Sequence, residues 1–270
     1  MIYRAIALTV AGSDSGGGAG IQADLKTFAA LGVFGTSAVT ALTAQNSLGV
    51  THVEVTSCES LRRQMEAVLS DFPVAAAKTG MVARAELIEV IADVFSAFPV
   101  PALVVDPVMV ATSGAVLLDD GAEEALRKRL LPLAEVVTPN LPEASRLVGF
   151  PVDDVPSMEA AARRLVELGA SSALVKGGHG SGPVVTDLFF DGSEVRLFRH
   201  SRLETADSHG TGCTLSAAIA AERAAGLPPA AAVERGLAYL QLALRHGFRP
   251  GRGPGPVGHA VVPPWLAGRK

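Results

Sequence analysis

The sequence predicts an α/β fold with a single doubly wound, mainly parallel sheet that carries helices on both faces. Short apolar stretches, typical of strands buried on both faces, alternate with longer stretches of helical periodicity. Several apolar stretches end in glycine or polar residues, as strands do where a sheet binds ligands. No linker rich in proline and serine divides the chain, so we expect one domain over residues 1–250.

The composition narrows the classes of function. The chain has 270 residues, of which 49% are hydrophobic but only 5% aromatic, so the core must consist of Ala, Val and Leu. A formal net charge of −4 offers no basic face for nucleic acid. Its two cysteines fit neither a disulfide framework nor a zinc site. With no signal-peptide pattern and no membrane-spanning stretch, we expect a soluble cytoplasmic protein.

The first predicted unit is a strand, a glycine-rich loop and a helix. An apolar strand at 5–10 precedes the loop at 13–20 and a helix at 21–31. The loop resembles a phosphate-binding loop but lacks both GK[ST] and GxGxxG. Asp24 lies one turn into the helix and is expected to point back toward the loop. A solvated carboxylate is the alternative.

A second strand, at 39–45, ends in polar residues. Gln45 stands at its carboxyl end, where it can offer an amide donor and acceptor to a flat heterocycle. The next predicted elements are a strand or flap at 50–56, a helix at 61–69, a strand at 75–77 that runs into Lys78, Thr79, Gly80 and Met81, and a helix at 86–98.

Carboxylates follow two further strands. Asp106 closes the apolar strand that starts at Ala102, as a metal-site or phosphate-site residue would, although it could also cap the next helix. Asn140 and Glu143 stand at a predicted helix start, where they could form a cap or place two oxygens near a hydrated magnesium ion. Between them, the small residues of 110–116 are candidates for a lid.

The C-terminal half continues the alternation. The predicted elements are helices at 123–131, 157–168 and 229–245, strands at 136–138 and 173–176, and an antiparallel hairpin of 184–190 and 194–200. The strand at 173–176 ends in Lys176 and two glycines. The Gly- and Pro-rich residues 251–270 contain GxGxxG by letters, but no strand precedes it and no helix follows, so we expect a mobile tail.

Gly210, Thr211 and Gly212 lead directly into Cys213 and an alanine-rich helix. A glycine-rich entry lets an anion approach the free N–H groups at a helix start. The same position is expected to lower the pKa of the Cys213 thiol, which makes the thiol a candidate base. The alternatives are a tight turn before a buried helix and a cysteine that serves as a small hydrophobe.

Taken together, the motifs are similar to one family. They are AGSDSGGGAGIQADLKT (11–27), TALTAQNS (40–47), KTGM (78–81), DPVMVATSG (106–114), TPNLPEA (138–144), VKGGH (175–179) and SHGTGCTLSAAIAA (208–221). In this order they resemble the hydroxymethylpyrimidine/phosphomethylpyrimidine kinases of thiamine biosynthesis, which belong to the ribokinase-like superfamily. The resemblance covers residues 5 to about 246. Gly16 and Ser208 are conservative departures from the family's serine and threonine.

The resemblance implies ATP and Mg²⁺ as cofactors and a role for each motif. Gly210, Thr211, Gly212 and Cys213 would form the anion hole for the transferring phosphoryl group, with Cys213 where most relatives in the superfamily have an aspartate. The pyrimidine would be held by Asp24 and Gln45 and framed by Gly12, Met81 and Val108. Asp106 and Glu143 would organise Mg²⁺ through water, and Lys176 would neutralise the nucleotide phosphates.

Two alternatives stay open at this point. Some pyridoxal kinases share nearly every motif, but they carry a lid cysteine that residues 110–114 lack, which favours the pyrimidine. A non-catalytic relative would be expected to lose the anion hole, Lys176 or Asp106, and all are present. The alanine-rich helices further suggest a homodimer.

Overall fold

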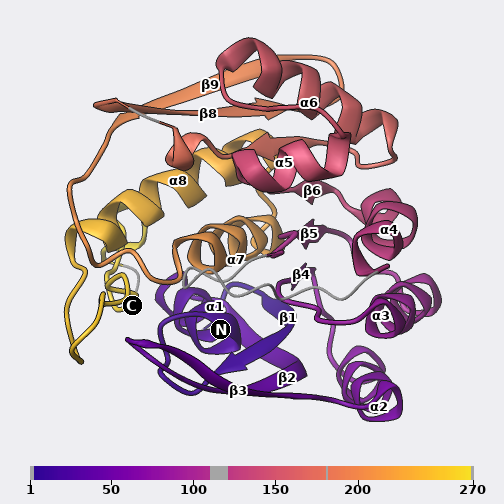
Figure 1. Cartoon of the computed structure of the whole chain (residues 1–270). Helices are drawn as coiled ribbons and strands as arrows, with labels where there is room; N and C mark the ends of the chain where they lie inside the picture. Colours follow the sequence, from indigo (N-terminus) through magenta and orange to yellow (C-terminus); the bar gives the residue numbers. More distant parts are fainter. Residues whose placement is uncertain (1–2, 110–120, 181, 269–270) are drawn as a thin grey trace.

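The computed structural model describes residues 3–109, 121–180 and 182–268. Within them a nine-stranded sheet forms the centre of the molecule, in the order β3-β2-β1-β4-β5-β6-β7-β8-β9 (Figure 1). The strands are β1 Ile6–Asp14, β2 Phe34–Asn46, β3 Gly49–Val55, β4 Ala76–Thr79, β5 Leu103–Val105, β6 Val136–Val137, β7 Ala173–Val175, β8 Val184–Phe190 and β9 Val195–Ser201.

The sheet is mixed but mainly parallel, as the sequence predicts. Strands β2, β1, β4, β5, β6 and β7 are parallel to their neighbours, whereas β3 at one edge and β8 and β9 at the other pair antiparallel. The chain leaves β1 for β2 on one side and returns to β4 on the other side. The carboxyl ends of β1 and β4 therefore flank the point where the winding reverses, which is where such sheets bind ligands.

Helices cover both faces of the sheet (Figure 1). One face carries α1 Gly20–Ala30, α7 Thr211–Ala224 and α8 Pro229–Arg245. The other carries α2 Cys58–Leu69, α3 Ala85–Ala97, α4 Ala122–Ala125, α5 Leu141–Val148 and α6 Val155–Glu167. Helix α7 lies against β1, β4 and β5 and is buried along nearly its whole length. Its small side chains allow it to lie that close, so the alanine-rich helix is an interior element.

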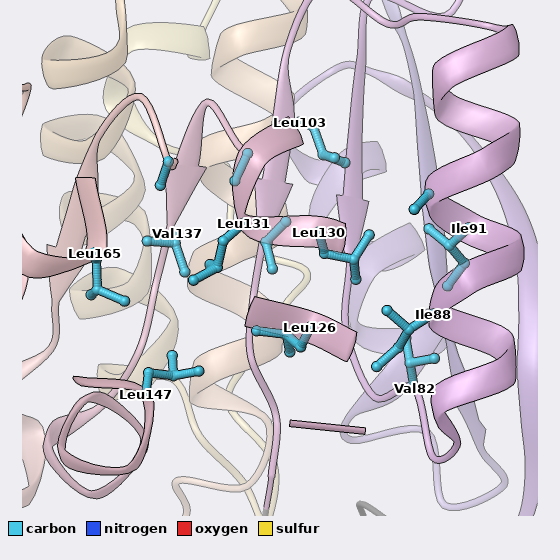
Figure 2. Packing of buried hydrophobic residues seen from close by; sticks show 14 of the residues in the cluster. Val82, Ile88, Ile91, Leu103, Leu126, Leu130, Leu131, Val137, Leu147 and Leu165 are labelled. Carbon is cyan, nitrogen blue, oxygen red and sulfur yellow. The ribbon is translucent and has the colours of Figure 1, made fainter. Parts of the chain in front are cut away.

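Aliphatic side chains from the strands and from the helices of the second face pack into one continuous layer (Figure 2). Leu103 and Val137 of the sheet meet Ile88 and Ile91 of α3 and Leu165 of α6 in this layer. At about 25 cal/mol per Å² of apolar surface buried, such layers supply most of the driving force for folding. The expected core of small aliphatic residues is confirmed.

The predicted helix at 123–131 is divided into three short segments. After α4 comes a π-helical turn, η1 Leu126–Leu130, and then a 3-10 turn, η2 Leu131–Leu133. Pro132 has no N–H to continue an α-helical ladder, so the helix cannot extend through it. The two remaining 3-10 turns are η3 Gly177–His179 and η4 Pro264–Leu266.

The C-terminal residues are packed against the body of the protein, in contrast to the mobile tail that composition suggested. Val257 is fully buried, and the His209 N–H donates to the Gly255 carbonyl at 3.1 Å. The Tyr239 hydroxyl donates to the His259 carbonyl at 2.7 Å. Contacts between residues so far apart in the sequence cannot be predicted from the local sequence pattern.

The candidate lid at 110–116 lies outside the described residues. Among the residues that are described, no helix combines the length and apolar character needed to cross a membrane.

Candidate active site

A cavity of about 1150 Å³ opens along the carboxyl edge of the parallel strands. It is lined by residues that follow β1, β4, β5, β6 and β7 and by the first turn of α7. Most of the residues expected from the sequence lie on its wall, namely Gly12, Gln45, Met81, Asp106, Val108, Glu143, Lys176, Gly210, Thr211, Gly212 and Cys213. The topology thus brings together motifs that lie far apart in the sequence.

The start of α7 forms the centre of the site. Gly210, the residue before the helix, has a φ of 82°, a left-handed conformation that glycine adopts without strain. A Cβ on Gly210 would also overlap the carbonyl oxygen of Gly18. The loop after β1 and the loop before α7 therefore interlock through glycine contacts. The first turn of α7 lines the cavity, and N–H groups at a helix start that lack a helical partner are suited to an anion.

Lys176 and Asp106 lie beside this helix start. The Lys176 Nζ is 3.0 Å from Asp106 Oδ1, and a Cβ on Gly212 would lie 3.6 Å from both side chains. Burial raises the pKa of Asp106, but the charges of Lys176 and Lys78 outweigh it and hold the pKa below its usual value. Burial lowers the pKa of Lys176, but Asp106 and Glu143 outweigh it and raise that pKa. Asp106 is thus ionised and Lys176 charged at neutral pH.

Glu143 and Asn140 form the cap that their spacing suggested. The Glu143 N–H donates to Asn140 Oδ1 at 2.9 Å, and Glu143 Oε2 accepts from the Asn140 N–H at 2.8 Å. Glu143 is 7% exposed, and burial raises its pKa to about 7, an effect that Lys176 opposes and Asp106 reinforces. A cation in the cavity would favour its ionised form.

The two carboxylates are suited to a hydrated metal rather than to direct ligation. Asp106 already accepts hydrogen bonds from Lys176, Thr138 and Ser216, and Glu143 accepts from the backbone of Asn140. Across the described residues, no three His, Cys, Asp or Glu side chains gather closely enough to ligate a metal ion. Mg²⁺ commonly keeps several waters and contacts only one or two carboxylates, so the donor set fits a water-bridged ion.

Cys213 lies in the first turn of α7, but its acidity is opposite to the expectation. Burial raises the pKa of its thiol to about 11, although the charge of Lys78 acts to lower it. A positive helix terminus lowers a thiol pKa only when it outweighs the loss of hydration. The thiol is therefore protonated at neutral pH, contrary to the expectation of a lowered pKa.

Asp24 is not on the cavity wall, contrary to the expectation that it binds substrate. It is fully buried, and both of its carboxylate oxygens accept from Lys78 Nζ, at 2.8 and 2.9 Å. Thr9 Oγ1 donates to the same carboxylate at 2.6 Å. Burial alone lowers the pKa of Lys78, but Asp24 outweighs it and raises that pKa, so the lysine stays charged. The sequence showed the turn on which Asp24 lies but not its partner on β4.

Gln45 does lie on the cavity wall, at the end of β2. Its backbone is fixed by Ser15, whose hydroxyl donates to the Gln45 carbonyl and accepts from the Gln45 N–H, both at 2.8 Å. Gly12 and Met81 touch one another nearby, since a Cβ on Gly12 would meet the Met81 methyl group. Gly12, Met81 and the Gln45 side chain all line the same cavity, and this mixture of apolar and amide groups suits an aromatic ring with polar edges.

The sequence reasoning missed Asp14 and His209, which also line the cavity. Asp14 accepts from the N–H groups of Gly16, Gly18 and Ala19 and lies 3.2 Å from His209 Nε2. Both residues fall within the motifs 11–27 and 208–221, which was a usable signal. Asp187 of β8 also lines the cavity and accepts from the Gly177 N–H at 2.8 Å, and no local pattern indicated that residue.

A glycine-rich helix start, a paired lysine and aspartate and a second carboxylate in one cavity are the groups expected of a phosphotransferase that acts on a small molecule. Residues 14–258 match the family model described as phosphomethylpyrimidine kinase, so the chain belongs to that family. The resemblance seen in the motifs is thereby confirmed.

Individual relatives agree with this assignment. The chain is 55% identical over 258 residues to the hydroxymethylpyrimidine/phosphomethylpyrimidine kinase of Rhizobium meliloti, covering 94% of this chain and 97% of the relative. Among solved structures, the phosphomethylpyrimidine kinase of Clostridium difficile has a TM-score of 0.80 at 40% identity, covering 88% of this chain and 99% of that one. An ADP complex of Bacillus subtilis pyridoxal kinase has a TM-score of 0.89 at 35% identity, with 96% and 98% covered.

Proposed function

We propose that this phosphotransferase uses ATP to phosphorylate 4-amino-5-hydroxymethyl-2-methylpyrimidine to its monophosphate and then to its diphosphate, for thiamine diphosphate biosynthesis in the cytoplasm. The observation that supports the proposal is that Gln45, at the end of β2, and the glycine-rich first turn of α7 line the same cavity. Gln45 would bind the polar edge of the pyrimidine, with Gly12, Met81 and Val108 framing its face.

The phosphoryl group would transfer within the anion hole of Gly210, Thr211 and Gly212. Phosphoryl transfer passes through a loose transition state, so positioning and charge neutralisation contribute more than proton removal. Lys176 would hold the nucleotide phosphates, and Cys213 would orient the attacking hydroxyl and accept its proton late. This role is consistent with a thiol pKa of about 11.

Asp106 and Glu143 would hold Mg²⁺ through water, since both line the cavity next to Lys176. When bound, the ion would neutralise charge on the phosphate oxygens. The Glu143 carboxylate would then stay ionised, because a neighbouring cation lowers a carboxyl pKa.

Phosphorylation of pyridoxal is a second candidate function, favoured by the TM-score of 0.89 to a pyridoxal kinase. The test is ADP release from ATP and Mg²⁺ with the hydroxymethylpyrimidine, its monophosphate and pyridoxal offered separately. We expect turnover of both pyrimidines well above that of pyridoxal. Turnover of pyridoxal alone would replace the proposal with the second candidate. A Gln45→Ala variant should raise the KM for the pyrimidine and still unfold at the same urea concentration.

We also propose a homodimer, although α7 is interior and the alanine-rich helix cannot form its interface. The support comes from the edge hairpin of β2 and β3, where Leu42 is 56% exposed and Leu48, in the turn between the two strands, is 60% exposed. Light scattering on the purified chain should give twice the 27.7 kDa chain mass. Aspartate at both positions should return the mass to that of a monomer.

A further inference from the structure

The side-chain amide of Gln45 lies between two polar partners on the cavity wall. As the amide is placed, its Nε2 lies 3.1 Å from His209 Nε2, and its Oε1 lies 3.3 Å from Thr43 Oγ1. An amide has two orientations related by half a turn, which exchange its oxygen acceptor and its nitrogen donor. Which orientation holds depends on what these two partners can donate or accept.

His209 can only donate at this position. Its Nε2 lies 3.2 Å from Asp14 Oδ2, and the Asp14 carboxylate also accepts from the N–H groups of Gly16, Gly18 and Ala19. Burial raises the pKa of Asp14, but the hydrogen bonds from His209, Ala19 and Gly16 outweigh it and keep the pKa below its usual value. An ionised carboxylate accepts only, so His209 Nε2 carries the hydrogen. That hydrogen faces Asp14 and Gln45 together.

Thr43 supplies the matching restriction at the other end. Its hydroxyl has a single hydrogen, which the Ser13 carbonyl accepts at 2.9 Å, closer than Gln45 at 3.3 Å, so toward Gln45 the Thr43 oxygen is left to accept. Both neighbours then require the half-turned amide, with Gln45 Oε1 toward His209 and Nε2 toward Thr43, in place of the orientation that sets Nε2 against His209. The reverse orientation would set two donors against each other at His209 and two acceptors at Thr43.

In that orientation the amide has one lone pair and one N–H left for a ligand. We propose that Asp14 and His209, with Thr43, lock the Gln45 amide so that the site recognises a 4-aminopyrimidine and rejects its 4-oxo counterpart. The inference rests on the proposed pyrimidine kinase function. The lone pair of Oε1 accepts from the exocyclic amino group, and the N–H of Nε2 donates to the adjacent ring nitrogen. In the 4-oxo compound that ring nitrogen carries hydrogen and the exocyclic atom is an acceptor, so both bonds are lost.

A glutamine without these partners could rotate its amide by half a turn and bind either compound. The selectivity therefore depends on the fixed orientation of the amide. His209 itself is held in place from two sides. A Cβ on Gly18 would overlap its ring, and its backbone forms a parallel bridge with Pro256. His209 and Thr43 are positioning residues in this scheme, because they act on the ring through Gln45.

The experiment compares kcat/KM for the two compounds, 4-amino and 4-oxo, in matched variants. His209→Leu removes the donor, whereas His209→Gln keeps an N–H near the same place. Thr43→Val removes the acceptor, whereas Thr43→Ser keeps it. We expect the ratio of kcat/KM values to fall about 10-fold or more in His209→Leu and Thr43→Val, the scale of one unsatisfied buried polar group. The ratio should be largely preserved in the two conservative variants. A general loss of activity cancels in this ratio.

Urea unfolding establishes which variants are folded. If His209→Leu does not fold, the comparison of Thr43→Val with Thr43→Ser still tests the proposal. The inference is overturned if the unaltered chain phosphorylates the two compounds equally well. It is also overturned if His209→Leu and Thr43→Val keep the original ratio of kcat/KM values. In either case the proposed kinase function is unaffected. No turnover of the aminopyrimidine by the unaltered chain would overturn the proposed function and the inference together.

Discussion

At the scale of single residues, Cys213 shows how burial and a helix terminus compete. The thiol stands at the positive end of α7 and near the charged Lys78, and both would promote ionisation. Loss of hydration is the larger effect, and it raises the pKa of the thiol to about 11. A position in the first turn of a helix is therefore not enough to make a cysteine a thiolate.

Alkylation with iodoacetamide tests this acidity. Because only the thiolate reacts, the rate at Cys213 should rise about tenfold for each pH unit between 7 and 10. Site-resolved mass spectrometry separates the reaction at Cys213 from that at Cys58, and a Cys213→Ala variant supplies the control. A rate that levels off near pH 8 would show that the helix terminus dominates instead.

Catalysis offers a second readout of the same residue. Cys213→Ala should bind nucleotide nearly as well as the unaltered chain but turn over much more slowly, because the substrate hydroxyl loses its orienting partner. Equilibrium binding of ADP and steady-state kinetics measure the two effects separately. Full activity in this variant would remove the thiol from the mechanism.

At the scale of elements, a buried ion pair joins α1 to β4. Lys78 and Asp24 are each fully buried, and Thr9 of β1 donates to the same carboxylate. Removing one charge of a buried pair leaves the other without compensation, which typically costs about 3–5 kcal/mol, whereas an apolar pair of similar volume is often tolerated.

We therefore expect Lys78→Met and Asp24→Leu each to lower the free energy of unfolding by about 3–5 kcal/mol, and the double variant to regain a large part of that loss. Urea unfolding of the four proteins gives the coupling energy directly. If Asp24→Leu instead kept its stability and raised the KM for the pyrimidine, Asp24 would bind substrate, as the sequence first suggested.

The sequence predicted the strands that end in site residues. A buried parallel strand is a short apolar run, and the polar residues that follow it lie at the carboxyl edge of the sheet, where ligands bind. This pattern placed Gln45, Asp106 and Lys176 correctly on one edge for that reason. It misplaced Asp24, because the partner that buries this carboxylate lies 54 residues away. It also missed His209 as a site residue. The contact of His209 with Asp14 spans 195 residues, and no periodicity encodes such a distance.

At the scale of the whole molecule, the last residues of the chain connect parts that are distant in sequence. Gly253 donates to Ser47 after β2, Gly255 donates to Asp207 before the anion hole, and His259 meets Thr214 of α7. Composition alone predicted a mobile segment, since glycine and proline give no periodicity. Each of these contacts uses a side chain, and the partners lie 45 to 206 residues apart, so composition could not show them.

His259 makes the stability of this docking depend on pH. The Thr214 hydroxyl donates to the Gly210 carbonyl at 2.8 Å, so His259 Nε2, 3.0 Å away, must donate to Thr214. His259 is 5% exposed, and burial, with the charges of Lys26 and His209, lowers its pKa to about 4. The folded protein therefore binds this proton less readily than the unfolded chain, whose histidine has its ordinary pKa of about 6.5.

Stability from this group is present above about pH 6.5 and is lost as the pH falls toward 4. The full loss is on the order of 3 kcal/mol, because each pH unit between the folded and unfolded pKa values contributes about 1.36 kcal/mol. A His259→Gln variant keeps an N–H for Thr214 but cannot be protonated. Urea unfolding between pH 7 and 4.5 should therefore show the unaltered chain losing more stability than the variant. Parallel pH profiles would mean that the C-terminal residues undock before His259 is protonated, so that docking contributes nothing to the cooperative unfolding of the molecule.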